Sequence, residues 1–128
     1  MTTKEELSKV EEAVNYYIQG TIKRDFDILA KAWHDAAKMF GLDKENKLVI
    51  YDKDFWKNSL AKKIDDPKYK RTSEILGLDI VGTIASAKVQ TVVEHSKGSV
   101  VYMDLLNLLK INDKWQIVNK IYDATYEE

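Results

Sequence analysis

The C-terminal half of the sequence is a succession of long β-prone segments, and this feature limits the possible folds more than any other. The residue types enriched in strands (Val, Ile, Thr and Tyr) are concentrated in segments 71–82, 84–96, 99–111 and 114–125. The short polar breaks between these segments are Gly82-Thr83, Lys97-Gly98 and Asn112-Asp113. Strands joined by tight turns pair antiparallel, so this half of the chain predicts an antiparallel β-meander.

The first segment has the 3.6-residue period of an amphipathic helix, predicted from about Lys4 to Gln19. Its apolar positions are Leu7, Val10, Val14, Tyr17 and Ile18. Thr3 followed by Glu6 matches a capping box, and Gly20 is expected to end the helix. The segment therefore offers one apolar face for packing.

Two further helices are predicted between the first helix and the meander. One covers about 24–33, and the other covers about 53–63 with Asp52 as its N-cap. Segments 38–41 and 48–51 flank the polar stretch DKENK and indicate a hairpin. Three helices followed by antiparallel strands place the chain in the α+β class rather than among the alternating βαβ folds.

Composition excludes several classes of partner. The 128 residues are 45% hydrophobic and 32% charged, which suits a single globular domain, 1–128, with its own core. The net charge is −1 and the best basic cluster, 68–71, follows Asp65 and Asp66, so neither nucleic acid nor an anionic membrane is expected as a partner. The chain has no cysteine, its two histidines lie far apart, and no apolar run could span a bilayer. We therefore expect no metal and no cofactor, and a cytoplasmic location.

The last hairpin predicts apolar side chains on both faces of the sheet. If Asn112-Asp113 is a two-residue turn, Ile111 lies opposite Lys114 and the register of the hairpin follows; with a bulge at this turn, the residues placed inward on one strand would point outward instead. The face assigned to the hollow of the sheet then carries Tyr102, Asp104, Leu106, Leu108, Trp115, Ile117, Asn119 and Ile121. The opposite face carries Val101, Met103, Leu105, Asn107, Leu109, Ile111, Val118 and Tyr122. Because the helices cover only one face, we expect a homodimer through the convex face, with a monomer that exposes scattered apolar residues as the alternative.

Three stretches of the sequence resemble the nuclear transport factor 2-like superfamily: YIQG, AWHDAAKMFG and DLLNLLKINDKWQIVNKIYD. The resemblance is strongest to the branch named "putative lumazine-binding", next to the SnoaL-like polyketide cyclases. It implies a cone-shaped α+β barrel, commonly a homodimer, in which three N-terminal helices pack on a strongly curved, mostly antiparallel sheet around a pocket. The superfamily includes ketosteroid isomerase, scytalone dehydratase, limonene epoxide hydrolase and many proteins without chemistry, so the fold leaves the function open.

A small group of polar and aromatic residues is expected to line the pocket. The predicted ligand-binding residues are Tyr17, Trp33, His34, Phe40, Trp56, Tyr102, Asp104 and Asn119. Asp104 lies mid-strand among apolar neighbours, which is the setting of a carboxylate general base. His34 is the candidate proton carrier from the helical side, and Asn119 is placed to position a substrate oxygen.

Each candidate also has a purely structural interpretation. His34 and Asp35 can satisfy backbone groups at the end of the second helix, and Asp104 can belong to a buried network with a Lys or Tyr. The aromatic residues can be core packing. We expect an uncharacterised domain that binds a small apolar or aromatic molecule in the cone pocket as a homodimer. The alternatives are an isomerase, cyclase or dehydratase of the SnoaL or ketosteroid isomerase type with Asp104 as base, and a protein-interaction module without a ligand.

Overall fold

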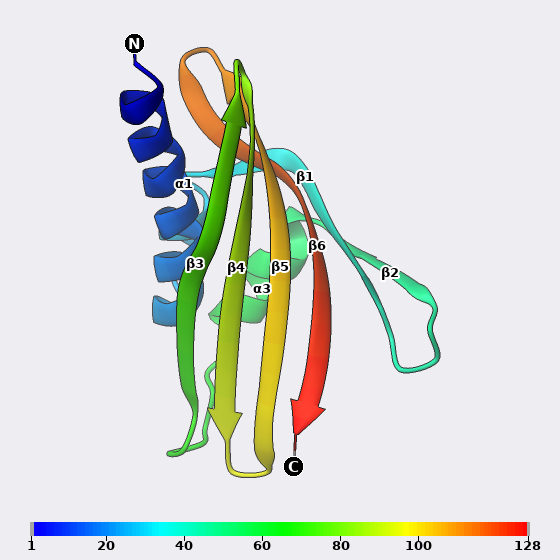
Figure 1. Ribbon diagram of the computed structural model, residues 1–128. Coiled ribbons are helices and arrows are strands. Elements are labelled where there is room, and N and C mark those ends of the chain that lie inside the picture. The colour runs from blue at the N-terminus through cyan, green and yellow to red at the C-terminus, as the bar shows by residue number, and fades with distance from the viewer. Residues whose placement is uncertain (1, 128) are drawn as a thin grey trace.

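The computed structural model describes residues 2–127 as three helices packed on one six-stranded sheet (Figure 1). The helices are α1 (Thr3–Lys23), α2 (Phe26–Leu29) and α3 (Lys53–Ala61). The strands are β1 (Trp33–Leu42), β2 (Leu48–Tyr51), β3 (Lys70–Val81), β4 (Ile84–His95), β5 (Gly98–Ile111) and β6 (Lys114–Glu127). The strand order is β2-β1-β6-β5-β4-β3, with β1 parallel to β6 and all other neighbours antiparallel. The predicted α+β architecture is confirmed.

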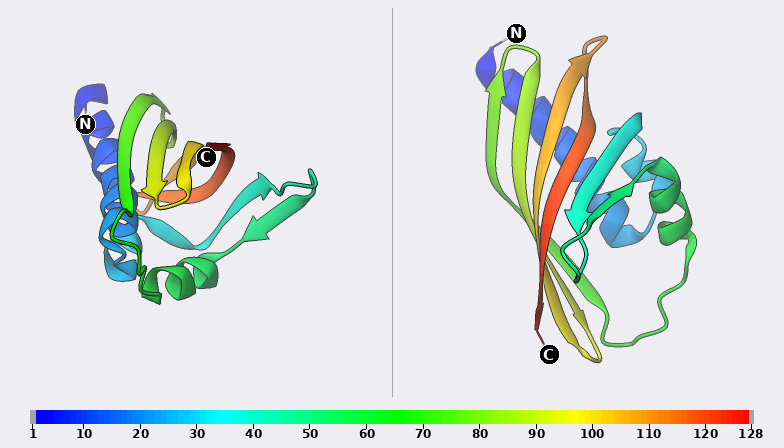
Figure 2. Two further views of the ribbon diagram at one scale, coloured as in Figure 1. Left: turned by 90° about the horizontal axis from the view of Figure 1, so that it is seen from below. Right: turned by 90° about the vertical axis from the view of Figure 1, so that its right-hand side faces the viewer.

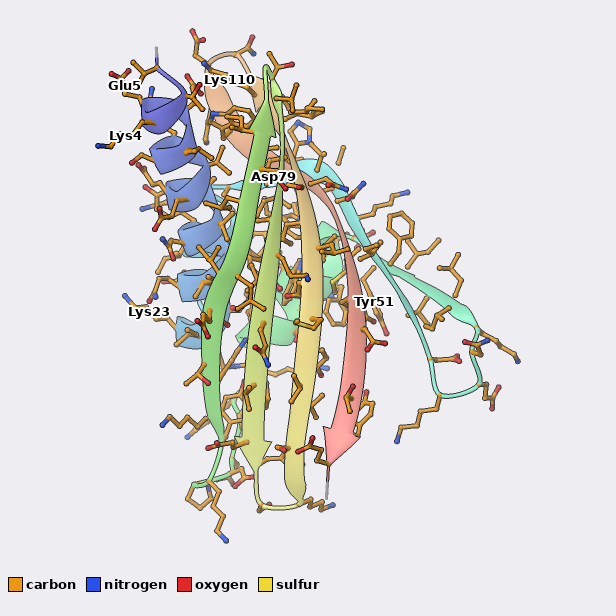
Figure 3. The ribbon with its side chains drawn as sticks, viewed as in Figure 1. Lys4, Glu5, Lys23, Tyr51, Asp79 and Lys110 are labelled. Carbon is orange, nitrogen blue, oxygen red and sulfur yellow. The ribbon has the colours of Figure 1, made fainter. Side chains whose placement is uncertain are left out.

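Helices α1 and α3 cover the same face of the sheet, which we call the inner face; the opposite face is the outer face. Tyr17 of α1 and Trp56 of α3 both place their rings against the ammonium of Lys120 on β6. Two views at right angles show α1 beside the meander and α3 beside the β1–β2 hairpin (Figure 2). The polar side of α1 points away from the sheet, as the labelled Lys4 and Lys23 show (Figure 3).

Helix α1 begins and ends at other residues than the sequence predicts. Its capping box joins Thr2 and Glu5, one residue earlier than expected. The helix also continues past Gly20 to Lys23. Gly20 does not end the helix. A glycine is needed there because α1 and α2 approach closely: a Cβ atom at this position would lie 2.6 Å from the backbone nitrogen of Leu29. The helix ends instead at Arg24, whose φ of 53° lies in the left-handed region.

The second predicted helix is wrong over most of its length, because α2 has only four residues and Trp33 already begins β1. Asp25 caps α2 by accepting hydrogen bonds from the backbone of Asp27 and Ile28. Trp33 pairs with Ile117 of β6, and this parallel pairing replaces the local helical pattern. The predicted hairpin of β1 and β2 is confirmed, as is the Asp52 cap of α3.

A β-bulge in the last hairpin reverses the predicted faces of its second strand. Ile111 pairs with Lys114 as predicted, and Leu108 pairs with Ile117. The next pair is Asn107 with Asn119, so Val118 is an extra residue without a partner. Side chains beyond the bulge therefore change sides. Compared with the prediction, Asn119 and Ile121 lie on the outer face, and Lys120 and Tyr122 lie on the inner face.

The core lies between the inner face and the three helices. Its fully buried side chains include Val10, Val14, Tyr17, Leu29, Trp33, Val89, Leu106, Leu108 and Ile117. The exposed large apolar side chains of the outer face include Leu42, Leu48, Ile50, Ile84, Leu105, Leu109 and Ile121. The sheet is thus apolar on both faces, as predicted from the last hairpin. Within residues 2–127, none of the helices is both long enough and apolar enough to cross a membrane.

Candidate functional site

A cavity of about 300 Å³ lies between the inner face of the sheet and α3. Its lining residues are Met39, Tyr51, Phe55, Trp56, Ser59, Arg71, Tyr102, Lys120, Tyr122 and Tyr126. The wall is mainly aromatic, and its only charged members are Arg71 and Lys120. The cavity draws on helix α3 and on every strand except β4, so it exists only in the assembled fold.

A buried hydrogen-bonded network forms one side of this cavity. The Tyr17 hydroxyl donates to Asp104 Oδ2 at 2.9 Å, and Lys120 Nζ donates to the same hydroxyl at 2.7 Å. Lys120 Nζ also lies 3.5 Å from Asp104 Oδ1. Asp104 is fully buried and Lys120 is only 5% exposed. Since a buried charge is costly unless it is paired, the network compensates both charges inside the protein.

Lys120 is the member of the network that faces the cavity. Its ammonium lies 5.1, 5.2 and 5.3 Å from the ring centroids of Tyr17, Trp56 and Tyr122. Burial lowers the pKa of Lys120 to about 8, even though the Asp104 carboxylate acts to raise it. The side chain is thus a desolvated cation enclosed by three aromatic rings.

The tyrosines around this cation are held in the protonated form. Burial, followed by the Asp104 carboxylate, raises the pKa of Tyr17 well above its ordinary value. Burial likewise raises the pKa of Tyr102 and of Tyr122. Their hydroxyl groups are therefore neutral donors and acceptors near neutral pH.

Arg71 on β3 supplies the second cation of the cavity. Its Nε atom is buried and has no hydrogen-bond partner. Its charge also lowers the pKa of Lys120, which shows that the two cations act on each other. Among the described residues, no carboxylate forms an ion pair with Arg71.

Five of the eight predicted binding residues lie at or directly behind the cavity. Trp56 and Tyr102 line it. Tyr17 and Asp104 lie behind Lys120 and hold it in place. Trp33 lies deeper, with its ring 6.2 Å from that of Tyr17 and 5.8 Å from that of Trp56. Their roles in binding stay predictions.

The three other predicted residues lie elsewhere, and their placement is corrected. His34 belongs to β1, and its Nδ1 accepts a hydrogen bond from the backbone of Ala36, two residues further on. Phe40 pairs with Ile121 on the outer face, because Met39 takes the inward position on β1. Asn119 accepts a hydrogen bond from Asn107, also on the outer face, because of the bulge at Val118.

Sequence reasoning missed the two cations of the cavity. Arg71 has a detectable pattern, since it is in phase with the inward-facing Ser73 and Ile75 on β3. Lys120 has none, because the regular alternation of its strand assigns it to the outer face. Only the bulge brings it inside.

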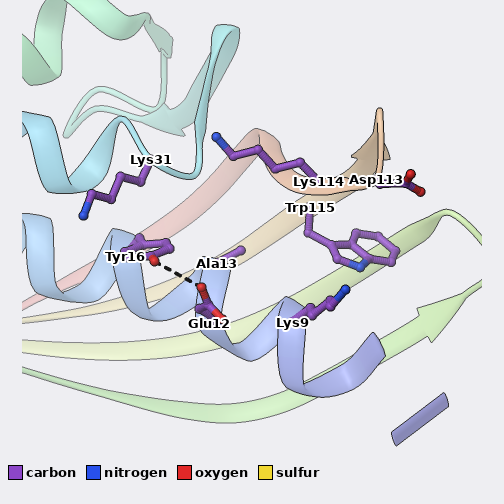
Figure 4. A pocket seen from close by; sticks show the side chains of 8 residues that line it. All are labelled: Lys9, Glu12, Ala13, Tyr16, Lys31, Asp113, Lys114 and Trp115. Carbon is purple, nitrogen blue, oxygen red and sulfur yellow. Dashed lines mark hydrogen bonds between the residues drawn. The ribbon is translucent and has the colours of Figure 1, made fainter. Parts of the chain in front are cut away.

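A second hollow, of about 430 Å³, lies on the outside of α1 near the β5–β6 turn (Figure 4). It is lined by Lys9, Glu12, Ala13, Tyr16, Lys31, Asp113, Lys114 and Trp115. Here the Tyr16 hydroxyl donates to Glu12 at 3.1 Å, and Lys31 lies over the Tyr16 ring. Glu12 and Lys31 are thus both engaged by Tyr16, so we assign the candidate site to the inner cavity. Among residues 2–127, no group of three His, Asp or Glu side chains is placed to hold a metal ion.

Residues 5–123 match the sequence model of the family described as "putative lumazine-binding". The chain belongs to this family. Among solved structures, the chain resembles an NTF2-like protein of unknown function from Shewanella baltica. The two chains are 31% identical, with a TM-score of 0.83 and 98% of each chain covered. An NTF2-like protein of unknown function from Methylobacillus flagellatus is 28% identical, with a TM-score of 0.77 over 98% of this chain and 95% of the other.

More distant solved structures share the fold alone. The CaMKII hub of S. rosetta is 16% identical, with a TM-score of 0.72 over 92% of this chain and 95% of the other. No curated protein matches the chain. The putative lumazine-binding family and its NTF2-like neighbours thus confirm the predicted superfamily.

Proposed function

We propose that this chain is a small-molecule-binding domain that takes a mainly aromatic ligand into the cavity beside α3. The observation that carries the proposal is the composition of the cavity lining: six of the lining side chains are aromatic, and they surround a space of about 300 Å³. Binding sites for small organic molecules are typically apolar hollows of this order with a few convergent polar groups. The family's description, which names a planar heteroaromatic ligand, agrees with this class of molecule.

The enzymatic alternative has less support from the geometry. A general base must come within hydrogen-bond reach of the proton that it removes. Asp104 Oδ2 is engaged by Tyr17, and Oδ1 faces Lys120, which separates the carboxylate from the cavity. We therefore assign Asp104 a positioning role: it holds Lys120 at the wall.

We further propose that the chain forms a homodimer through the convex outer face. Phe40 pairs with Ile50 on one side and Ile121 on the other, and Ile121 pairs with Leu105. These pairings make one continuous apolar strip across four strands, and Ile121 in it is 49% exposed. A contiguous apolar strip marks an interaction surface, and a second copy is the simplest partner. One structural neighbour is itself described as a hub, which agrees with self-association. A cytoplasmic location stays a prediction from the sequence.

A thermal-shift titration with small aromatic compounds tests the ligand-binding proposal. Ligand at about 100 times Kd stabilises the folded state by about 2.7 kcal/mol, so Tm should rise with ligand concentration. Ser59→Trp places a large side chain in the cavity and should abolish the rise. Asn58→Trp adds the same side chain at the exposed neighbouring position and should preserve it. A Tm that stays flat for the wild type across the compounds rules out the proposal.

A further inference from the structure

We infer that the cavity selects an aromatic molecule that carries one carboxylate, with the carboxylate bound between Arg71 and Lys120. The inference rests on the proposed function and specifies its ligand. It follows from the charges of the site, from the donors left free there, and from the chemistry of the remaining wall.

The ionised side chains of the site do not balance. Arg71 and Lys120 contribute two positive charges, and Asp104 contributes one negative charge. Asp104 is committed to Lys120 and to the Tyr17 hydroxyl. Arg71 interacts with the neutral hydroxyl of Tyr17 but has no ion pair among the described residues, so one positive charge is left without an anionic partner at a partly buried position. A single acidic group on the ligand supplies the missing charge.

Both cations also have donors available. Arg71 Nε is buried without a hydrogen-bond partner, and a guanidinium fork matches the two oxygens of a carboxylate. Lys120 donates to Tyr17 and faces Asp104, which leaves a third N–H direction. A carboxylate at this position therefore accepts from both residues and relieves the repulsion through which Arg71 lowers the pKa of Lys120.

The rest of the wall fits the body of such a ligand. It contains no acidic side chain that would repel an anion, and its hydrogen-bonding groups are hydroxyls and the indole N–H of Trp56. Phe55 and Trp56 lie on α3, opposite Tyr102 and Tyr122 of the sheet. The cavity therefore offers a cationic region for the acid and aromatic surfaces on two sides for a planar body.

Matched pairs of ligands test the inference. Benzoate, cinnamate and naphthoate are each compared with the corresponding neutral amide, and Kd is measured by following backbone amide shifts in two-dimensional NMR. Hydrogen bonds to charged groups predict an affinity about tenfold or more higher for each acid than for its amide. Each amide has nearly the shape of its acid, so its binding reports the aromatic cavity alone.

Substitutions locate the anion site. Arg71→Gln removes the charge and should abolish the preference for acids while the amides still bind. Lys70→Gln makes the same change at the exposed neighbouring position on β3 and should keep the preference. Retained amide binding also shows that the Arg71→Gln protein is folded.

The outcomes separate the two proposals. Equal binding of acids and amides overturns the carboxylate inference and leaves the proposed function standing. An acid preference that survives Arg71→Gln overturns the assignment of the anion to Arg71. Failure of both series to bind overturns the proposed function, and the inference with it.

Discussion

The ammonium of Lys120 lies 2.7 Å from the phenol oxygen of Tyr17, although the two residues are 103 positions apart in the chain. This contact joins the first helix to the last strand in the interior of the protein. It is reinforced by Asp104, which accepts a hydrogen bond from the same phenol at 2.9 Å. The first prediction concerns what happens when the cation is removed.

Lys120→Met should destabilise the protein strongly. The substitution keeps the length and apolar stem of the side chain but leaves Asp104 as an unpaired buried charge, which costs about 3–5 kcal/mol. Urea unfolding followed by circular dichroism measures the loss. Adding Asp104→Asn to the same protein should recover part of it, because the buried charge is then removed. If the protein with Lys120→Met alone is as stable as the wild type, Lys120 does not compensate the buried charge of Asp104.

Stability should rise with pH between about pH 8 and pH 10. In the folded protein the pKa of Lys120 is lowered to about 8 from an ordinary value of 10.5, so in this window the unfolded chain binds more protons at this position. The charged or titratable groups that face the ammonium are Asp104, Arg71, Tyr17 and Tyr122. Above about pH 10 the raised pKa values of the tyrosines act in the opposite direction, because only the unfolded chain then loses those protons.

The measurement is the free energy of unfolding at several pH values from about 7 to about 10. Lys120→Met serves as the comparison, since it shares every other titrating group. The difference in stability between the two proteins should widen as pH rises toward 10. A difference that does not change with pH would mean that the ammonium keeps its ordinary pKa in the folded state.

Gly41→Ala should disturb the cavity through Tyr122. Gly41 lies on the inner face of β1, and a methyl group there would collide with the ring of Tyr122. The ring must then leave its present position beside Lys120, at a cost of about 1–3 kcal/mol for an overpacked site. Tm and the affinity for an aromatic ligand should both fall. Gly77→Ala is the matched control, because a methyl group at that position meets nothing within 4 Å.

Ile121→Asp should convert the proposed dimer into a monomer. It places a charge at the centre of the apolar strip on the outer face, where Ile121 pairs with Phe40 and Leu105. Sedimentation velocity measures the mass of each species in solution. Asn58→Asp, which adds the same charge on exposed α3, should leave the dimer intact. A wild-type protein that sediments as a monomer at all concentrations would disprove this interface.

The sequence predicts the meander well because each strand is long, rich in β-formers and bounded by turn residues. The same local rules identify Asp52 as a helix cap and place Asp104 inward on β5. The start of β1 could not be predicted in this way. Its residues continue the helical period of Phe26 and Leu29, and only the parallel pairing of Trp33 with β6 makes them a strand.

The candidate site depends on a feature with even less local signature. The stretch Ile117-Val118-Asn119 is compatible with a regular strand and with a bulged one, since Val118 is apolar and both faces of the sheet accept apolar residues. The bulged form is favoured by contacts distant in the sequence, because it gives Lys120 the buried partners Tyr17 and Asp104. Arg71, by contrast, follows the ordinary alternation of its strand and was detectable in principle.

The extra residue at Val118 makes the chemistry of the interior depend on the course of the backbone as well as on side-chain identity. A strand of the same length without the bulge would turn the ammonium of Lys120 outward and the amide of Asn119 inward, whereas deleting Val118 would give a regular strand in which Lys120 still faces inward. Among homologous chains, a lysine at this distance from the β5–β6 turn should therefore face the interior where the strand carries the bulge and face outward where the strand is regular.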